Sequence, residues 1–226
     1  MFMKSLITCL LTATTLCALP QAVIFDFGGV MTGESNREAV VDFLCESFQL
    51  SKDEFQLVNS RKREAVKGGM TDEAFWLTYA AEQNIILPLD WVSQFKDAMR
   101  QAINPSQNMY ELVDELKNTH LKVGMLSNID TRLANIVRDF GLYQPFHPCI
   151  LSCDIGVEKP DERAYKILLS SLHLPANQVV FIDDKKENVC AAKCLCIDAI
   201  LFESYEQIKE ELENRGLLSS GKKVFW

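Results

Sequence analysis

The short run Ala22–Phe25 is the feature that most constrains the fold, because Asp26 follows it directly and Gly28 and Gly29 come after one further residue. These apolar residues, rich in β-branched and aromatic side chains, predict a strand that is buried on both faces. Strands of this kind are typical of parallel sheets, which carry their chemistry at the carboxyl edge. We therefore expect Asp26 at that edge, although an Asp before two glycines is, taken alone, equally consistent with a turn cap.

Three further apolar runs end in polar side chains that are capable of chemistry. They are Leu121–Leu126 before Ser127-Asn128, Cys149–Ser152 before a loop that contains Glu158-Lys159, and Gln178–Ile182 before Asp183-Asp184. Because the carboxyl ends of parallel strands share one edge, we expect these side chains to converge around Asp26. One carboxylate could then act as a nucleophile, a hydroxyl and backbone amides could hold an oxyanion, and a lysine could neutralise charge. Two more acids could hold a hard cation such as Mg²⁺.

The segments DFGGV, LSN, EKP and FIDD, in this order, resemble the four motifs of the haloacid dehalogenase-like (HAD) hydrolase superfamily. The resemblance covers roughly residues 22–205. Each motif is weak alone, but four in order, each after a strand-like run, are specific. The phrases FIDDKKENVCAAK, EKPDERAY and GGMTDEAFW look most like the phosphatase branch with a helical cap. That branch includes glucose-1-phosphate phosphatase and the N-terminal domain of soluble epoxide hydrolase.

This resemblance implies a Mg²⁺-dependent phosphomonoester hydrolase that acts on a small-molecule phosphate ester, with sugar phosphates among the candidates. The reaction would pass through an aspartyl-phosphate. The implied catalytic residues are Asp26, Ser127 and Lys159. The implied metal ligands are Asp26, the backbone carbonyl of Gly28, and Asp184, with Asp183 and Asn188 supporting them and with Gly29 and Asn128 contacting the substrate.

Gly28 departs from the family pattern, because most phosphatases of this superfamily carry a second Asp two residues after the nucleophile as general acid/base. A general acid contributes roughly 10²–10⁴-fold, so its absence predicts slow hydrolysis of poor leaving groups. Two alternatives follow. One is a 2-haloacid dehalogenase, in which the Asp attacks carbon without a metal, and the other is a catalytically degenerate protein that binds a phosphorylated ligand. The Asp183-Asp184 pair favours the metal-dependent phosphatase.

An insert over residues 33–105 separates the first two motifs and shows helical periodicity. The expected helices are Arg37–Phe48, Lys52–Val66, Asp72–Gln83 and Pro88–Ile103. A helical insert at this place predicts a cap over the catalytic edge, which in this superfamily excludes water and sets specificity. The aromatic residues Phe75, Trp76, Tyr79 and Trp91 either line the interface with the core or pack inside the cap, and their helical spacing favours packing inside the cap.

Helix and strand patterns alternate over the remainder of the chain. The predicted fold class is therefore α/β, with a Rossmann-like parallel sheet, helices on both faces and an inserted all-helical cap. We expect the core to comprise residues 22–32 and 106–216, and residues 217–226 to form a flexible tail.

Composition limits the partners and suggests a location. The net charge of −8 argues against a nucleic-acid partner, because a phosphate backbone is bound by a basic surface. Lys4 and the uncharged stretch from Ser5 to Leu19 resemble a secretory signal peptide, which we place at residues 1–21. That stretch is too short for a stable membrane span. We therefore expect an exported protein, periplasmic or secreted, with a cytoplasmic location as the alternative.

Overall fold

The computed structural model describes residues 19–219. Most of the predicted signal peptide, residues 1–18, and the end of the predicted tail, residues 220–226, lie outside this range. Within the described range, no helix has both the length and the apolar composition that a membrane crossing requires.

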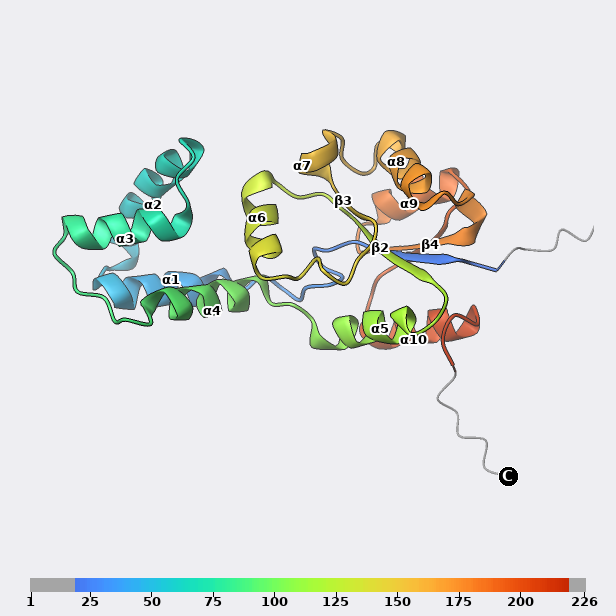
Figure 1. The fold of residues 1–226 in the computed structure, drawn as a ribbon, viewed down its shortest axis with the longest axis horizontal. Coiled ribbons are helices and arrows are strands. Elements are labelled where there is room, and N and C mark those ends of the chain that lie inside the picture. The colour runs from blue at the N-terminus through green and yellow to red at the C-terminus, as the bar shows by residue number, and fades with distance from the viewer. Residues whose placement is uncertain (1–18, 220–226) are drawn as a thin grey trace, which may run out of the picture.

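Five parallel strands form one sheet, which confirms the predicted α/β class (Figure 1). They are β1 (Ala22–Phe25), β2 (Lys122–Ser127), β3 (Cys149–Leu151), β4 (Val179–Asp183) and β5 (Asp198–Leu201). Their order is β3-β2-β1-β4-β5, so β1 is the central strand. Every residue of β1 is fully buried, as its apolar composition predicts.

Strand register explains why distant motifs meet. Phe25 pairs with Met125 of β2 and with Ile182 of β4. The next residue on each strand, namely Asp26, Leu126 and Asp183, therefore lies at one level of the carboxyl edge. Asp26 is held at this level by its backbone N–H, which donates to the Ile182 carbonyl at 2.9 Å.

Helices cover both faces of the sheet, and successive residues of β1 point into different clusters. Val23 and Phe25 pack with α5 (Gln107–Lys117), α6 (Thr131–Asp139) and α10 (Tyr205–Asn214). Ile24 packs with α8 (Glu162–Leu172) and α9 (Lys186–Cys194) on the other face. The short helix α7 (Ser152–Ile155) and the 3₁₀ turn η1 (Ala176–Gln178) complete the core.

The first two residues of the predicted tail, Leu217 and Leu218, pack against the core. Leu217 and Leu218 are each only 7% exposed and pack in the same cluster as α5 and α10. Burial of these two leucines extends the core beyond residue 216.

Four helices form a cap that stands apart from the sheet, beyond the carboxyl ends of its strands (Figure 1). They are α1 (Arg37–Phe48), α2 (Lys52–Lys67), α3 (Asp72–Glu82) and α4 (Trp91–Ile103). The cap has its own aromatic core, in which the rings of Phe48 and Trp76 are 5.1 Å apart. Phe75, Trp76, Tyr79 and Trp91 all lie inside this core, so they pack the cap and do not line its interface.

The helix α4 begins at Trp91 and not at the predicted Pro88. Pro88 lies in the preceding turn, where its carbonyl accepts a hydrogen bond from the Trp91 N–H at 3.1 Å. The proline therefore shapes the approach to the helix and is not part of its first turn.

Two features connect the cap to the core. The first is a short ribbon, in which Thr32 bridges Pro105 and the Gly33 N–H donates to the Asn104 carbonyl at 2.9 Å. The second is an ion pair, in which Nε and Nη2 of Arg132 on α6 donate to Oδ2 and Oδ1 of Asp72 at 2.7 and 2.5 Å. We call this pair the clasp. It ties the first residue of α3 to the core, 60 positions away in the chain.

Candidate active site

The Lys159 ammonium group lies at the centre of the converging strands and is 1% exposed. Its Nζ donates to Asp26 Oδ1 at 2.7 Å, to Asp183 Oδ2 at 2.6 Å and to the Leu126 carbonyl at 2.7 Å. These acceptors come from the ends of β1, β4 and β2, which the register places at one level. One buried cation therefore holds three strand ends together.

Asp183 supports this lysine and has little capacity left for other partners. It is fully buried, and its Oδ1 accepts hydrogen bonds from the Lys185 backbone N–H at 2.8 Å and from Asn188 Nδ2 at 3.0 Å. Its Oδ2 accepts from Lys159 and, at 3.0 Å, from the same amide of Asn188. This arrangement fits the supporting role predicted for Asp183 and Asn188.

Asp26 and Asp184 have carboxylate oxygens that could still bind a metal ion. Burial raises the pKa of Asp26 to about 6, because the attraction of Lys159 only partly offsets desolvation and Asp183 adds repulsion. Asp184 is exposed, but partial desolvation and the negative charge of Asp183 raise the pKa of its carboxyl as well. Acidic oxygens of Asp26, Asp183 and Asp184 lie within 4.8 Å of one another. A divalent cation would relieve this crowding of negative charge, so the donor set fits Mg²⁺.

The two glycines of the first motif differ in what they permit. Gly29 has φ +78°, and a Cβ atom there would lie 2.5 Å from Oδ2 of Asp184. Glycine is therefore needed at position 29 for the backbone to approach Asp184. At position 28, by contrast, a Cβ atom would meet no described atom within 4 Å, and the φ of Gly28 is not in the left-handed region.

Ser127 and Asn128 directly follow Leu126, whose carbonyl binds Lys159. Ser127 ends β2 and is 2% exposed. The Asn128 side chain bonds the backbone of Lys159, since its Oδ1 accepts from the Lys159 N–H at 2.9 Å and its Nδ2 donates to the Lys159 carbonyl at 2.7 Å. The resemblance implies that Asn128 contacts the substrate. Its side chain is engaged with the backbone of Lys159, so its own backbone is the part that could make such a contact.

Two contacts of this region are not predicted by the sequence. The Leu126 carbonyl binds Lys159, and the Arg132–Asp72 clasp joins the cap to the helix that follows the second motif. Neither has a local sequence signal, because a backbone carbonyl carries no residue-type information and Asp72 looks like an ordinary residue in a first helical turn.

The sequence of the chain agrees with this geometry. A model of the haloacid dehalogenase-like hydrolases matches residues 23–202. The chain belongs to this family. The match covers all four motifs and confirms the resemblance that they carry, so the protein is a HAD-like hydrolase.

Two curated relatives match over different lengths. Sesquiterpene phosphatase astK of Aspergillus oryzae is 28% identical over 182 residues, which cover 80% of this chain and 88% of that protein. Bifunctional epoxide hydrolase 2 of Rattus norvegicus is 36% identical over 72 residues, which cover 32% of this chain but only 13% of that protein.

Solved structures share the fold. A HAD family enzyme of Bacteroides thetaiotaomicron, in complex with magnesium and inorganic phosphate, aligns with a TM-score of 0.52 and 19% identity. The alignment covers 84% of this chain and 98% of that one. Similarity at this level shows a common fold.

The two glycines provide a matched test of the proposed metal ligands. We expect Gly29→Ala to weaken Mg²⁺ binding by about tenfold or more, because its Cβ displaces Asp184 and strains the backbone by roughly 1–3 kcal/mol. Gly28→Ala should bind Mg²⁺ like the wild type, since its Cβ meets open space. Calorimetric titration of both variants with Mg²⁺ measures this difference. Equal affinities in the two variants would show that Asp184 does not hold the ion.

Proposed function

We propose that the protein is a Mg²⁺-dependent phosphomonoester hydrolase that acts on small-molecule esters through an aspartyl-phosphate. The observation that carries the proposal is the placement of Asp26, whose Oδ1 is held by Lys159 while Asp184 lies within 4.8 Å. A carboxylate nucleophile that lies beside a fixed ammonium group, with a second carboxylate near enough to share a metal ion, suits attack on a phosphoryl group. The phosphatase relative and the magnesium and phosphate complex of the Bacteroides enzyme support this chemistry.

The proposed reaction has two steps, and both take place at the Asp26 carboxylate. A carboxylate oxygen of Asp26 attacks phosphorus, the bond from phosphorus to the ester oxygen breaks, and the alcohol leaves with a proton from water or from a cap residue. Water then attacks the aspartyl-phosphate, which releases inorganic phosphate and restores Asp26. Lys159 keeps Asp26 oriented and compensates charge on the transferring group, while Ser127 and neighbouring amides hold phosphate oxygens.

Mg²⁺ would bind to Asp26, Asp184 and the Gly28 carbonyl and would offset negative charge on the phosphoryl oxygens. Burial raises the pKa of Asp26 and so disfavours the charged form that must attack. A nearby cation would favour the charged form and offset this shift. The exposed Asp184 and the open backbone at Gly28 make the site accessible from solvent.

A metal-free 2-haloacid dehalogenase is the second candidate, and Gly28 favours it, because that reaction does not need the missing second Asp. Asp184 counts against it. This carboxylate has its pKa raised by partial desolvation and by Asp183, and it has no evident task in a reaction without a cation. The retained acidic cluster therefore favours the phosphatase.

The ester group has two candidate classes. Sugar phosphates follow from the resemblance of the sequence motifs. The similarity to sesquiterpene phosphatase astK, which extends over most of both chains, favours an ester of a hydrocarbon alcohol instead.

Replacement of the nucleophile and removal of the metal test the proposal. We expect Asp26→Asn to lower kcat for an aryl phosphate by at least about a thousandfold, because the amide cannot form the acyl-phosphate. EDTA should have a comparable effect on the wild type, and added Mg²⁺ should restore the rate. Asp97→Asn, on the exposed side of α4, is the matched control and should turn over like the wild type. Full activity of Asp26→Asn, or release of chloride from 2-chloropropionate in EDTA, would contradict the phosphatase assignment.

The open space at Gly28 generates a second test. Without a carboxylic acid there, we expect kcat/KM to rise steeply across a series of phosphate esters as the pKa of the leaving alcohol falls. Gly28→Asp fits without a clash and should raise the rate for poor leaving groups by up to about 10²-fold, whereas the isosteric Gly28→Asn should not. A flat dependence in the wild type, with chemistry rate-limiting, would mean that another residue already supplies the proton.

A further inference from the structure

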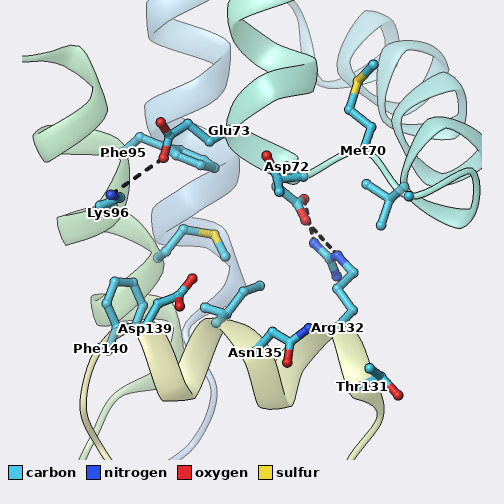
Figure 2. A pocket seen from close by; sticks show the side chains of 15 residues that line it. Met70, Asp72, Glu73, Phe95, Lys96, Thr131, Arg132, Asn135, Asp139 and Phe140 are labelled. Atoms are coloured by element: carbon cyan, nitrogen blue, oxygen red, sulfur yellow. Dashed lines mark hydrogen bonds and ion pairs between the residues drawn. The ribbon is translucent and has the colours of Figure 1, made fainter.

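A cavity of about 560 Å³ lies between the cap and α6 (Figure 2). This volume is within the range of about 300–1,000 Å³ that is typical of small-molecule sites. The floor is the cap-facing side of α6, and the walls come from α4 and from the turn between α2 and α3.

Apolar surface makes up the larger part of the cavity lining, which also includes polar side chains such as Asn135 and Asp139. Its apolar side chains are Val66, Met70, Phe95 and Met99 from the cap and Ile136 and Phe140 from the core side. Met70 is 39% exposed, which leaves its flexible thioether free to adjust to an irregular apolar partner. An organic group that enters this cavity would therefore meet hydrocarbon, thioether and aromatic surface.

The most buried charge in the lining is already neutralised. Asp72 accepts both clasp hydrogen bonds from Arg132 and a further one from Lys62 Nζ at 2.7 Å. At the opposite rim, Lys96 lies 3.6 Å from Glu73 (Figure 2). The clasp thus fixes the cap against α6, and a ligand would meet the apolar surface together with the polar side chains of Asn135 and Asp139.

The cavity is distinct from the phosphate site but close to it along the chain. In the described part of the chain, its lining includes none of Asp26, Lys159 and Asp184. Thr131, which does line it, follows Ser127 by four positions, so their Cα atoms are at most about 14 Å apart. A compact ester bound at Asp26 could not fill the cavity as well, whereas an ester with an elongated group could reach it.

Resting on the proposed function, we propose that the substrate is the phosphomonoester of an elongated hydrocarbon alcohol. Its phosphate would lie at Asp26 and its apolar chain would extend past Thr131 into the cavity. A hexose would leave most of the apolar surface without an apolar partner, and its hydroxyl groups would lose hydrogen bonds to water where they face methionine and aromatic side chains.

The test is hydrolysis of n-alkyl phosphates of increasing chain length, from ethyl to dodecyl, below their micelle-forming concentrations. The leaving-group pKa is nearly constant across this series, so chain length alone varies. We expect kcat/KM to rise by about threefold to fourfold for each methylene that enters the cavity and to level off when the cavity is full. Glucose 6-phosphate should be hydrolysed no better than ethyl phosphate.

Substitutions in two walls locate the effect. Met70→Glu in the cap turn and Ile136→Glu on α6 should each lower the ratio of decyl to ethyl kcat/KM by on the order of tenfold. Leu133→Glu is the matched control, because Leu133 is 37% exposed on the same helix and does not line the cavity. Its ratio should equal that of the wild type.

The outcomes separate this inference from the proposed function. Hydrolysis of aryl and ethyl phosphates with no gain from chain length would overturn the inference and leave the phosphatase intact. If no ester is hydrolysed, calorimetric binding of decylphosphonate decides. Binding that Ile136→Glu weakens and Leu133→Glu does not would support the apolar site, and absence of binding would overturn it.

Discussion

The ammonium group of Lys159 is the contact on which the catalytic edge depends. It is buried, and it bonds the ends of β1, β2 and β4 through Asp26, the Leu126 carbonyl and Asp183. Burial of two carboxylates without this cation would cost several kcal/mol, since unpaired buried charges are among the most costly features of a fold. The parallel register places the acceptors at one level, and Asn128 holds the lysine backbone in place. The strand register that builds the sheet therefore also brings the catalytic residues together.

The cap is connected to the core at the same edge of the sheet. The chain leaves β1 through the Asp26 loop and enters the cap directly, and the Thr32–Pro105 bridge returns it to the core. The clasp adds a second attachment, which places the apolar walls of the cap above α6. In Asp72, burial opposes ionisation, but hydrogen bonds from Arg132 and Lys62 outweigh it and lower the pKa of the carboxyl. The clasp is therefore charged at neutral pH and holds the two parts of a candidate substrate site together.

Residue type and strand pattern are enough to predict the fold and the convergence of Asp26, Lys159 and the Asp183-Asp184 pair. Each of these residues ends or follows an apolar run, and parallel topology brings such ends together. Contacts made by the backbone or across long separations cannot be predicted in this way. Three examples depend on the positions of loops and helices in the folded chain. They are the hydrogen bonds between the Asn128 side chain and Lys159, the clasp, and the burial of Leu217. The cavity has the same origin, because its walls come from segments whose spacing only the folded chain defines.

The proposed reaction requires that Lys159 keep the buried Asp26 in the charged form that can act as a nucleophile. Carboxyl-carbon NMR titration of Asp26 in metal-free protein tests this requirement most directly, with Lys159→Met as the variant and the exposed Lys185→Met as the matched control. We expect a pKa of about 6 for Asp26 in the wild type and in Lys185→Met, and a clearly higher value in Lys159→Met, because the attraction of Lys159 would then no longer oppose desolvation. An Asp26 pKa that is the same in all three proteins would show that Lys159 does not keep Asp26 in its charged form.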